Sequence, residues 1–142
     1  MVPGSMDGGG DVAEVDKSEK ITINIGLVDL GQIDLLVNEG FYANRTDFIR
    51  TAIRRQLETR SGAVDETVAR RTLTLGTQRY SRRDLEELRA AGRTVELRVL
   101  GLATIDADVS PELALATITS VEVLGAFRAP PAVKEALAPR TV

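Results

Sequence analysis

The 142-residue chain contains no cysteine and no histidine. These absences exclude disulfide bonds, thiol chemistry and imidazole catalysis, and they remove the commonest ligands of zinc. Asp106 and Asp108 are two acids in one turn, which we interpret as a solvated loop rather than a metal site. Because no catalytic or phosphate-loop pattern appears either, we expect no enzyme activity, no metal and no cofactor. Reduced surroundings such as the cytoplasm fit a chain without cysteine.

Aromatic residues are also scarce, at 4%, and no apolar run reaches the length of a membrane span. We therefore expect no contact with a membrane. The core must be built from Leu, Ile, Val and Ala, and a small unit of this kind often needs a partner chain to bury enough surface. The net charge of −3 is unfavourable for binding phosphates, so the placement of the charges matters more than their sum.

Residues 1–18 are dominated by Gly, Pro, Ser and Asp and show no apolar period, so we predict a disordered lead-in. Residues 19–25, EKITINI, alternate strictly between apolar and polar side chains, which predicts a strand. One face would carry Ile21, Ile23 and Ile25, and the other would carry Lys20, Thr22 and Asn24. Taken alone, this could be an ordinary half-buried edge strand.

Two helices are predicted after the strand. Residues 27–39 have apolar side chains at helical spacing, with Asp29 as a candidate N-cap and Gly40 placed to end the helix. Asn44 is a candidate N-cap for a second helix that runs to about residue 60, and Asp47 favours its dipole. The apolar stripe of the second helix holds Phe48, Ile49, Ala52, Ile53 and Leu57.

The predicted strand has nothing to pair with inside this segment. A second copy solves the problem if the two strands pair antiparallel about a two-fold axis and the four helices cover their apolar face, since an open strand edge is otherwise a liability. The expected core of this dimer is Ile21, Ile23, Ile25, Phe48, Ile49 and Ile53.

With these features, EKITINI and the later run GFYANRTDFIRTAIRRQLE resemble the CopG/Arc type of ribbon-helix-helix repressor, over residues 19–60. The resemblance implies that the paired strands enter the major groove of double-stranded DNA. The base contacts would then come from Lys20, Thr22 and Asn24, and the phosphate contacts from Asn44, Arg45 and Thr46. The alternatives are a solvated strand face and a cap without a ligand.

Residues 19–60 hold six acidic and six basic side chains, so the segment is neutral. We therefore expect modest non-specific affinity for DNA and a dependence on specific contacts or on several dimers side by side.

The second half of the chain shows a repeat. Residues 61–70 are predicted to be a linker or a helical extension, and residues 71–142 three β/α units. The pairs Leu75-Gly76, Leu100-Gly101 and Leu124-Gly125 lie 25 and 24 residues apart. Each unit reads as an apolar strand ending at the Leu-Gly pair, a polar turn and a short helix; Ser81 and Ser110 begin two of the helices.

The period is similar to that of leucine-rich repeats, although the asparagine ladder of that family is missing. The alternative is a small α/β domain with accidental spacing. The predicted fold class is thus α+β, with a dimeric ribbon-helix-helix followed by a leucine-rich-repeat-like domain for oligomerisation or partner binding.

The function predicted from the sequence is a cytoplasmic transcriptional repressor, bound to the nucleoid when active, that acts as a homodimer or a higher oligomer. Two alternatives stay open. One is an antitoxin whose C-terminal part binds a toxin, and the other is an assembly protein that uses the ribbon-helix-helix only to dimerise.

Overall fold

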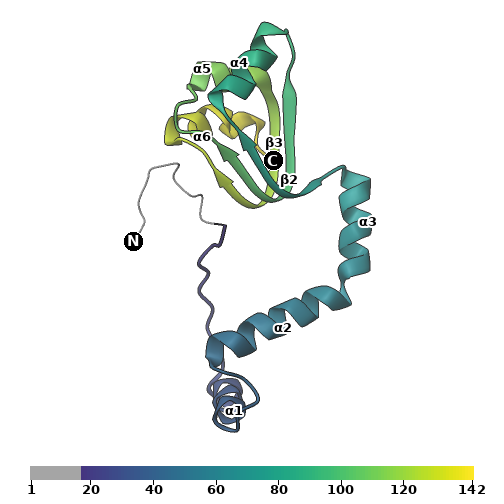
Figure 1. Ribbon diagram of the computed structural model, residues 1–142, viewed down its shortest axis with the longest axis vertical. Helices are drawn as coiled ribbons and strands as arrows, with labels where there is room; N and C mark the ends of the chain where they lie inside the picture. Colours follow the sequence, from purple (N-terminus) through teal and green to yellow (C-terminus); the bar gives the residue numbers. More distant parts are fainter. Residues whose placement is uncertain (1–16) are drawn as a thin grey trace.

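The computed structural model of the chain describes residues 17–142. The predicted lead-in lies outside the described residues except for Lys17 and Ser18, which have no regular secondary structure. The fold is α+β (Figure 1). Its elements in chain order are α1 (Leu27–Asn38), α2 (Arg45–Thr59), α3 (Ser61–Arg71), β1 (Thr74–Tyr80), α4 (Arg82–Ala90), β2 (Val95–Ile105), α5 (Pro111–Thr117), β3 (Ile118–Arg128), α6 (Pro131–Leu137) and the short 3₁₀ turn Ala138–Arg140.

Helix α1 begins at Leu27, the first residue of the predicted helical spacing, but its N-cap is not the predicted residue. Gly26 occupies the N-cap position of α1 and Asp29 lies in the first turn, so the prediction of Asp29 as the cap was wrong. The predicted end was correct, because Gly40 has a φ of 85° directly after the C-cap. The N–H groups of Gly40 and Phe41 donate to the carbonyls of Val37 and Leu36, which is the hydrogen-bond pattern of a Schellman motif.

Residues 61–71 form α3, the helical one of the two alternatives for this stretch. The chain turns sharply at Arg60, where α2 ends, and α3 leads on to the sheet (Figure 1). Helix α3 ends on Thr72, which has a φ of 55° and is the one non-glycine residue with a positive φ in the described part of the chain. A β-branched residue in this conformation is strained, so the junction between α3 and β1 costs conformational free energy.

The C-terminal half, residues 73–142, contains a parallel three-stranded sheet in the order β1-β2-β3, with a helix after each strand. The three Leu-Gly pairs are in register, with Leu75 beside Leu100 and Leu100 beside Leu124. The predicted strand ends were wrong, because all three strands continue past the glycine. The predicted start at residue 71 was also wrong, because Arg71 belongs to α3.

A column of three glycines explains how the strands pass the Leu-Gly pairs. Gly76, Gly101 and Gly125 have φ values of 125°, 140° and 118°, which side chains rarely tolerate. A Cβ on Gly101 would lie 2.1 Å from the carbonyl oxygen of Gly76, and one on Gly125 would lie 2.1 Å from that of Gly101. Each strand therefore kinks at the same level, and pairing continues because all three kinks stack.

Helices α4, α5 and α6 lie on one face of the sheet (Figure 1). The core lies between the sheet and these helices. Strands β2 and β3 and all three helices contribute fully buried side chains to it, whereas β1 contributes none. These side chains are Leu85, Leu97, Val99, Ala103, Ala114, Ile118, Val121, Val133 and Leu137. The predicted caps are present, since the hydroxyl oxygens of Ser81 and Ser110 accept hydrogen bonds from the N–H groups of Asp84 and Leu113. No helix within residues 17–142 is long and apolar enough to cross a membrane.

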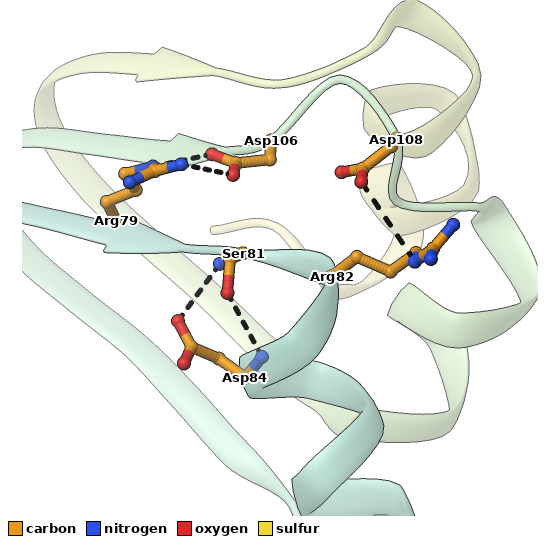
Figure 2. A network of polar contacts seen from close by, with 6 residues as sticks. All are labelled: Arg79, Ser81, Arg82, Asp84, Asp106 and Asp108. Atoms are coloured by element: carbon orange, nitrogen blue, oxygen red, sulfur yellow. Dashed lines mark hydrogen bonds and ion pairs between the residues drawn. The ribbon is translucent and has the colours of Figure 1, made fainter. Parts of the chain in front are cut away.

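Polar contacts gather where β1 and β2 end (Figure 2). Arg79 donates two hydrogen bonds to Asp106, at 2.8 and 2.6 Å, and this pairing raises the pKa of Arg79. Arg82 lies 4.0 Å from Asp108. Asp106 and Asp108, which we interpret as a solvated loop rather than a metal site, are therefore both within ion-pairing distance of arginines.

Candidate nucleic-acid interface

The structure assigns no strand to residues 19–25 in the single chain. A strand exists only through pairing, and no other segment of residues 17–142 lies alongside as a partner strand. Lys20, Thr22 and Asn24 are all exposed. The isoleucines are exposed as well, with 75% of Ile21 and 65% of Ile23 accessible, while Ile25 is half-buried. The pairing of this segment with a second copy stays a prediction.

The N-terminal arm, residues 17–72, leaves nearly all of its apolar side chains exposed or only half-buried. Ile33 is its one buried residue. Phe48 and Ile49 are half-buried, and Ile53 is 48% exposed. Other large apolar side chains of the arm are also exposed, namely Leu27, Val28, Leu35, Phe41 and Leu57. An apolar surface of this extent on two short helices marks a site of association.

The start of α2 is organised by two reciprocal hydrogen bonds. Asn44 Oδ1 accepts from the N–H of Asp47 at 2.8 Å, and Asp47 Oδ2 accepts from the N–H of Ala43 at 2.9 Å. The predicted cap at Asn44 is thereby confirmed. The first N–H groups of a helix have no carbonyl one turn before them and carry a partial positive charge. At Arg45 and Thr46 this chemistry suits an anion, and both residues are exposed.

The guanidinium of Arg45 has a partner that the sequence did not reveal. It donates two hydrogen bonds of 2.8 Å to the carboxylate of Asp34 on α1. The hydrogen bonding, together with the opposite charge, lowers the pKa of Asp34 and raises that of Arg45. Arg45 thus links α1 to α2, and any phosphate contact by its side chain would have to share the guanidinium with Asp34. Tyr42 and Phe48 pack edge to face near the same turn, with centroids 5.0 Å apart.

A second unforeseen contact connects the arm to the sheet. Arg128, on β3, donates to the carbonyl of Ser18 at 3.1 Å and to Glu19 Oε1 at 2.5 Å. Glu19 directly precedes Lys20, so an acid that would repel phosphates beside the polar face is paired with a base. Sequence spacing offered no signal for this contact, because the two residues lie 109 positions apart.

Comparison with protein families matches residues 16–134 to one described as the Ribbon-Helix-Helix transcriptional regulator family. The chain belongs to this family. The match corrects our expectation that the likeness covers residues 19–60 alone, because it includes the whole sheet and most of α6. No curated protein and no solved structure matches the chain.

Proposed function

We propose that the chain is a sequence-specific DNA-binding repressor whose residues 19–25 pair with those of a second copy. The observation that carries the proposal is the unpaired segment itself, which exposes isoleucines on one face and polar side chains on the other. Pairing two copies about a two-fold axis gives each strand a partner, and it allows Ile21 and Ile23 to pack under the helices. We assign Ile25, Phe48, Ile49 and Ile53 to the same dimer core.

The polar face of the paired strands would read bases. A two-stranded ribbon fits the major groove, where Lys can donate to guanine, Asn can pair with adenine, and Thr can contact a thymine methyl. Lys20, Thr22 and Asn24 supply these three kinds of group from each copy. Their exposure in the single chain leaves them accessible for this role.

The start of α2 would hold the DNA backbone. A phosphate can accept hydrogen bonds from the first N–H groups of the helix, which Asn44 orients through its cap. The Thr46 hydroxyl could donate to the same phosphate. Arg45 adds positive charge, although its guanidinium is also bound to Asp34. Contacts of this kind set the position of the protein without reading sequence.

The charge balance limits how tightly one dimer can bind. Residues 19–60 are neutral overall, and the pair between Glu19 and Arg128 removes one acid from the vicinity of the polar face. We therefore propose that specificity comes from base contacts and that adjacent dimers bind together. The same neutrality favours a second candidate, an assembly protein that uses the arm only to dimerise.

A gel-shift titration with the promoter of the protein's own gene separates the two candidates. Changing Lys20, Thr22 and Asn24 to Ala should abolish specific binding while light scattering still shows a dimer. Arg70→Ala is the matched control, because Arg70 is exposed on α3 and its loss removes the same single charge as the loss of Lys20. We expect the salt slope to report at most about six phosphates per dimer. No binding by the unmodified chain at low salt would favour the assembly protein.

A further inference from the structure

The sheet has an open face, opposite α4, α5 and α6. On this face, side chains that are paired across the three strands form rows. One row is Leu75, Leu100 and Leu124, and the next is Thr77, Leu102 and Ala126. We propose that a second copy of this chain packs its own open face against these two rows. The proposal rests on the dimer of the proposed function and identifies a second contact within it or between such dimers.

Parallel sheets in proteins are almost always covered on both faces. Here the helices cover one face (Figure 1), whereas a groove of about 560 Å³ follows the other. The groove is lined by the glycine column and by residues 17–19 and 21 of the arm. Leu102 is only 6% exposed, but Leu75 is 66% and Leu124 is 42% exposed. The arm thus covers part of the open face and leaves most of the leucine row in contact with water.

Most of the charges that border the two rows are already paired within the chain, although Lys17 also lines the groove. On one side Glu122 binds both Arg71 and Arg98, which lies 3.3 Å away. On the other side the pairs are Arg79 with Asp106 and Arg128 with Glu19. An apolar centre between ion-paired borders has the composition of a protein interface, with a dry core and a polar rim. Because the opposite charges within each of these groups neutralise one another, the face suits an uncharged partner surface better than nucleic acid.

A second copy is the occupant that these features favour. Pairing through residues 19–25 holds two sheets in one particle, where linked sites face each other at effective concentrations of roughly millimolar. The leucine row crosses all three strands, so a two-fold axis that lies between the two faces, opposite Leu100 of β2, would place the row of one copy against the same row of the other. Two apolar faces whose contact is too weak to join separate molecules can then remain in contact.

Crosslinking in the full chain tests the contact directly, because the chain has no cysteine of its own. Facing sheets pack about 10 Å apart, so Leu100→Cys on the central strand should join two copies through a short bis-maleimide, each end of which adds to one cysteine thiol. Glu112→Cys, exposed on α5 in the helical layer, is the matched control and should crosslink far less. Joined chains within a dimer or between dimers both support the proposal. Equal yields for the two variants would overturn it.

Charged substitutions on the open face provide the second arm of the test. In the Leu100→Cys background, Leu75→Glu with Leu124→Glu should reduce the crosslinked fraction at least about tenfold, the effect of a 1.4 kcal/mol loss in contact free energy. Leu115→Glu is the control, because Leu115 is 39% exposed on α5 and its loss should change nothing. Undiminished crosslinking in the double variant, with an unchanged circular dichroism spectrum, would contradict the proposal.

The two proposals fail separately. If the unmodified chain does not bind its promoter but the Leu100→Cys variant still crosslinks, only the DNA-binding proposal is lost. If the chain binds the promoter as a dimer and the Leu100→Cys variant does not crosslink, only the contact between open faces is lost.

Discussion

The N-terminal arm, residues 17–72, and the C-terminal unit, residues 73–142, treat their apolar residues in opposite ways. The arm buries Ile33 and no other hydrophobic side chain, whereas the C-terminal unit buries fourteen. Both parts contain regular helices with defined caps, so local structure is not what separates them. The difference is that the C-terminal unit buries most of its large apolar side chains within the single chain, whereas those of the arm stay mostly exposed or half-buried.

The largest expected effect comes from a substitution that disrupts the proposed dimer of the arm and leaves the C-terminal unit unchanged. Ile23→Glu places a charge in the proposed dimer core, so light scattering should show a monomer and the concentration dependence of Tm should vanish. Asn24→Glu adds the same charge on the opposite face and should leave the dimer intact. A dimer that survives Ile23→Glu would mean that the arm does not hold the two copies together.

The next largest effect concerns two glycines, one from each part. Gly101→Ala should destabilise the C-terminal unit by about 3 kcal/mol or more, because its Cβ would collide with the carbonyl of Gly76 in a strained conformation. Gly31→Ala should stabilise α1 by about 1 kcal/mol, since nothing in the chain lies within 4 Å of the new Cβ. Urea titrations measure both changes. A loss of stability in Gly31→Ala would indicate that a second chain packs closely there.

A third prediction concerns the ion cluster at the junction of the two parts. Glu122 is 16% exposed and joins Arg71, at the end of α3, to Arg98. Glu122→Gln should cost about 2 kcal/mol in the free energy of unfolding, because two arginines then lose their shared carboxylate. Glu96→Gln is the control, since Glu96 is 58% exposed and lies 3.9 Å from Arg98. Equal losses in the two variants would show that the cluster has no special role.

The smallest effects come from the helix caps, where the two parts should behave alike. Asn44→Ala and Ser81→Ala each remove a side-chain acceptor from a helix start and should cost about 1 kcal/mol by thermal unfolding. A much smaller loss for Asn44 would mean that α2 is held by the partner chain rather than by its own cap.

The Ser81 cap also predicts a pH dependence. Hydrogen bonds from the backbone N–H and the hydroxyl of Ser81 lower the pKa of Asp84 below its ordinary value. The folded state therefore binds a proton less readily than the unfolded state at this carboxyl. Its contribution to stability is present above the ordinary carboxyl pKa and is lost as the pH falls through the lowered one. Asp84→Asn should remove this part of the acid dependence of Tm.

Local sequence signals predicted both helices of the arm and most of their ends. Asn44 as a cap and Gly40 as a helix end depend on backbone chemistry within a few residues, and both are present. Asp29 failed as a cap because the chain leaves the extended conformation at Gly26, before the acid is reached. The links from Arg45 to Asp34 and from Arg128 to Glu19 could not be predicted, since they depend on how separate elements approach one another.

In the C-terminal unit the period of the Leu-Gly pairs is visible in the sequence, but its meaning is not. Glycine in a strand usually marks a turn or a bulge, which favours the wrong prediction that each strand ends there. The strands continue because the neighbouring strand kinks at the same level, which only the register reveals. The likeness to leucine-rich repeats and the role of this unit in assembly remain predictions.

The sequence by itself determined the helices of the arm, the alternation of residues 19–25 and the caps at Asn44, Ser81 and Ser110, because these follow from contacts within one or two turns. The tertiary structure decided the rest. Parallel pairing stacks three glycines that share no local neighbour, and it leaves a leucine row uncovered on one face. Such features arise from residues some 25 positions apart, whose packing no short stretch of sequence encodes.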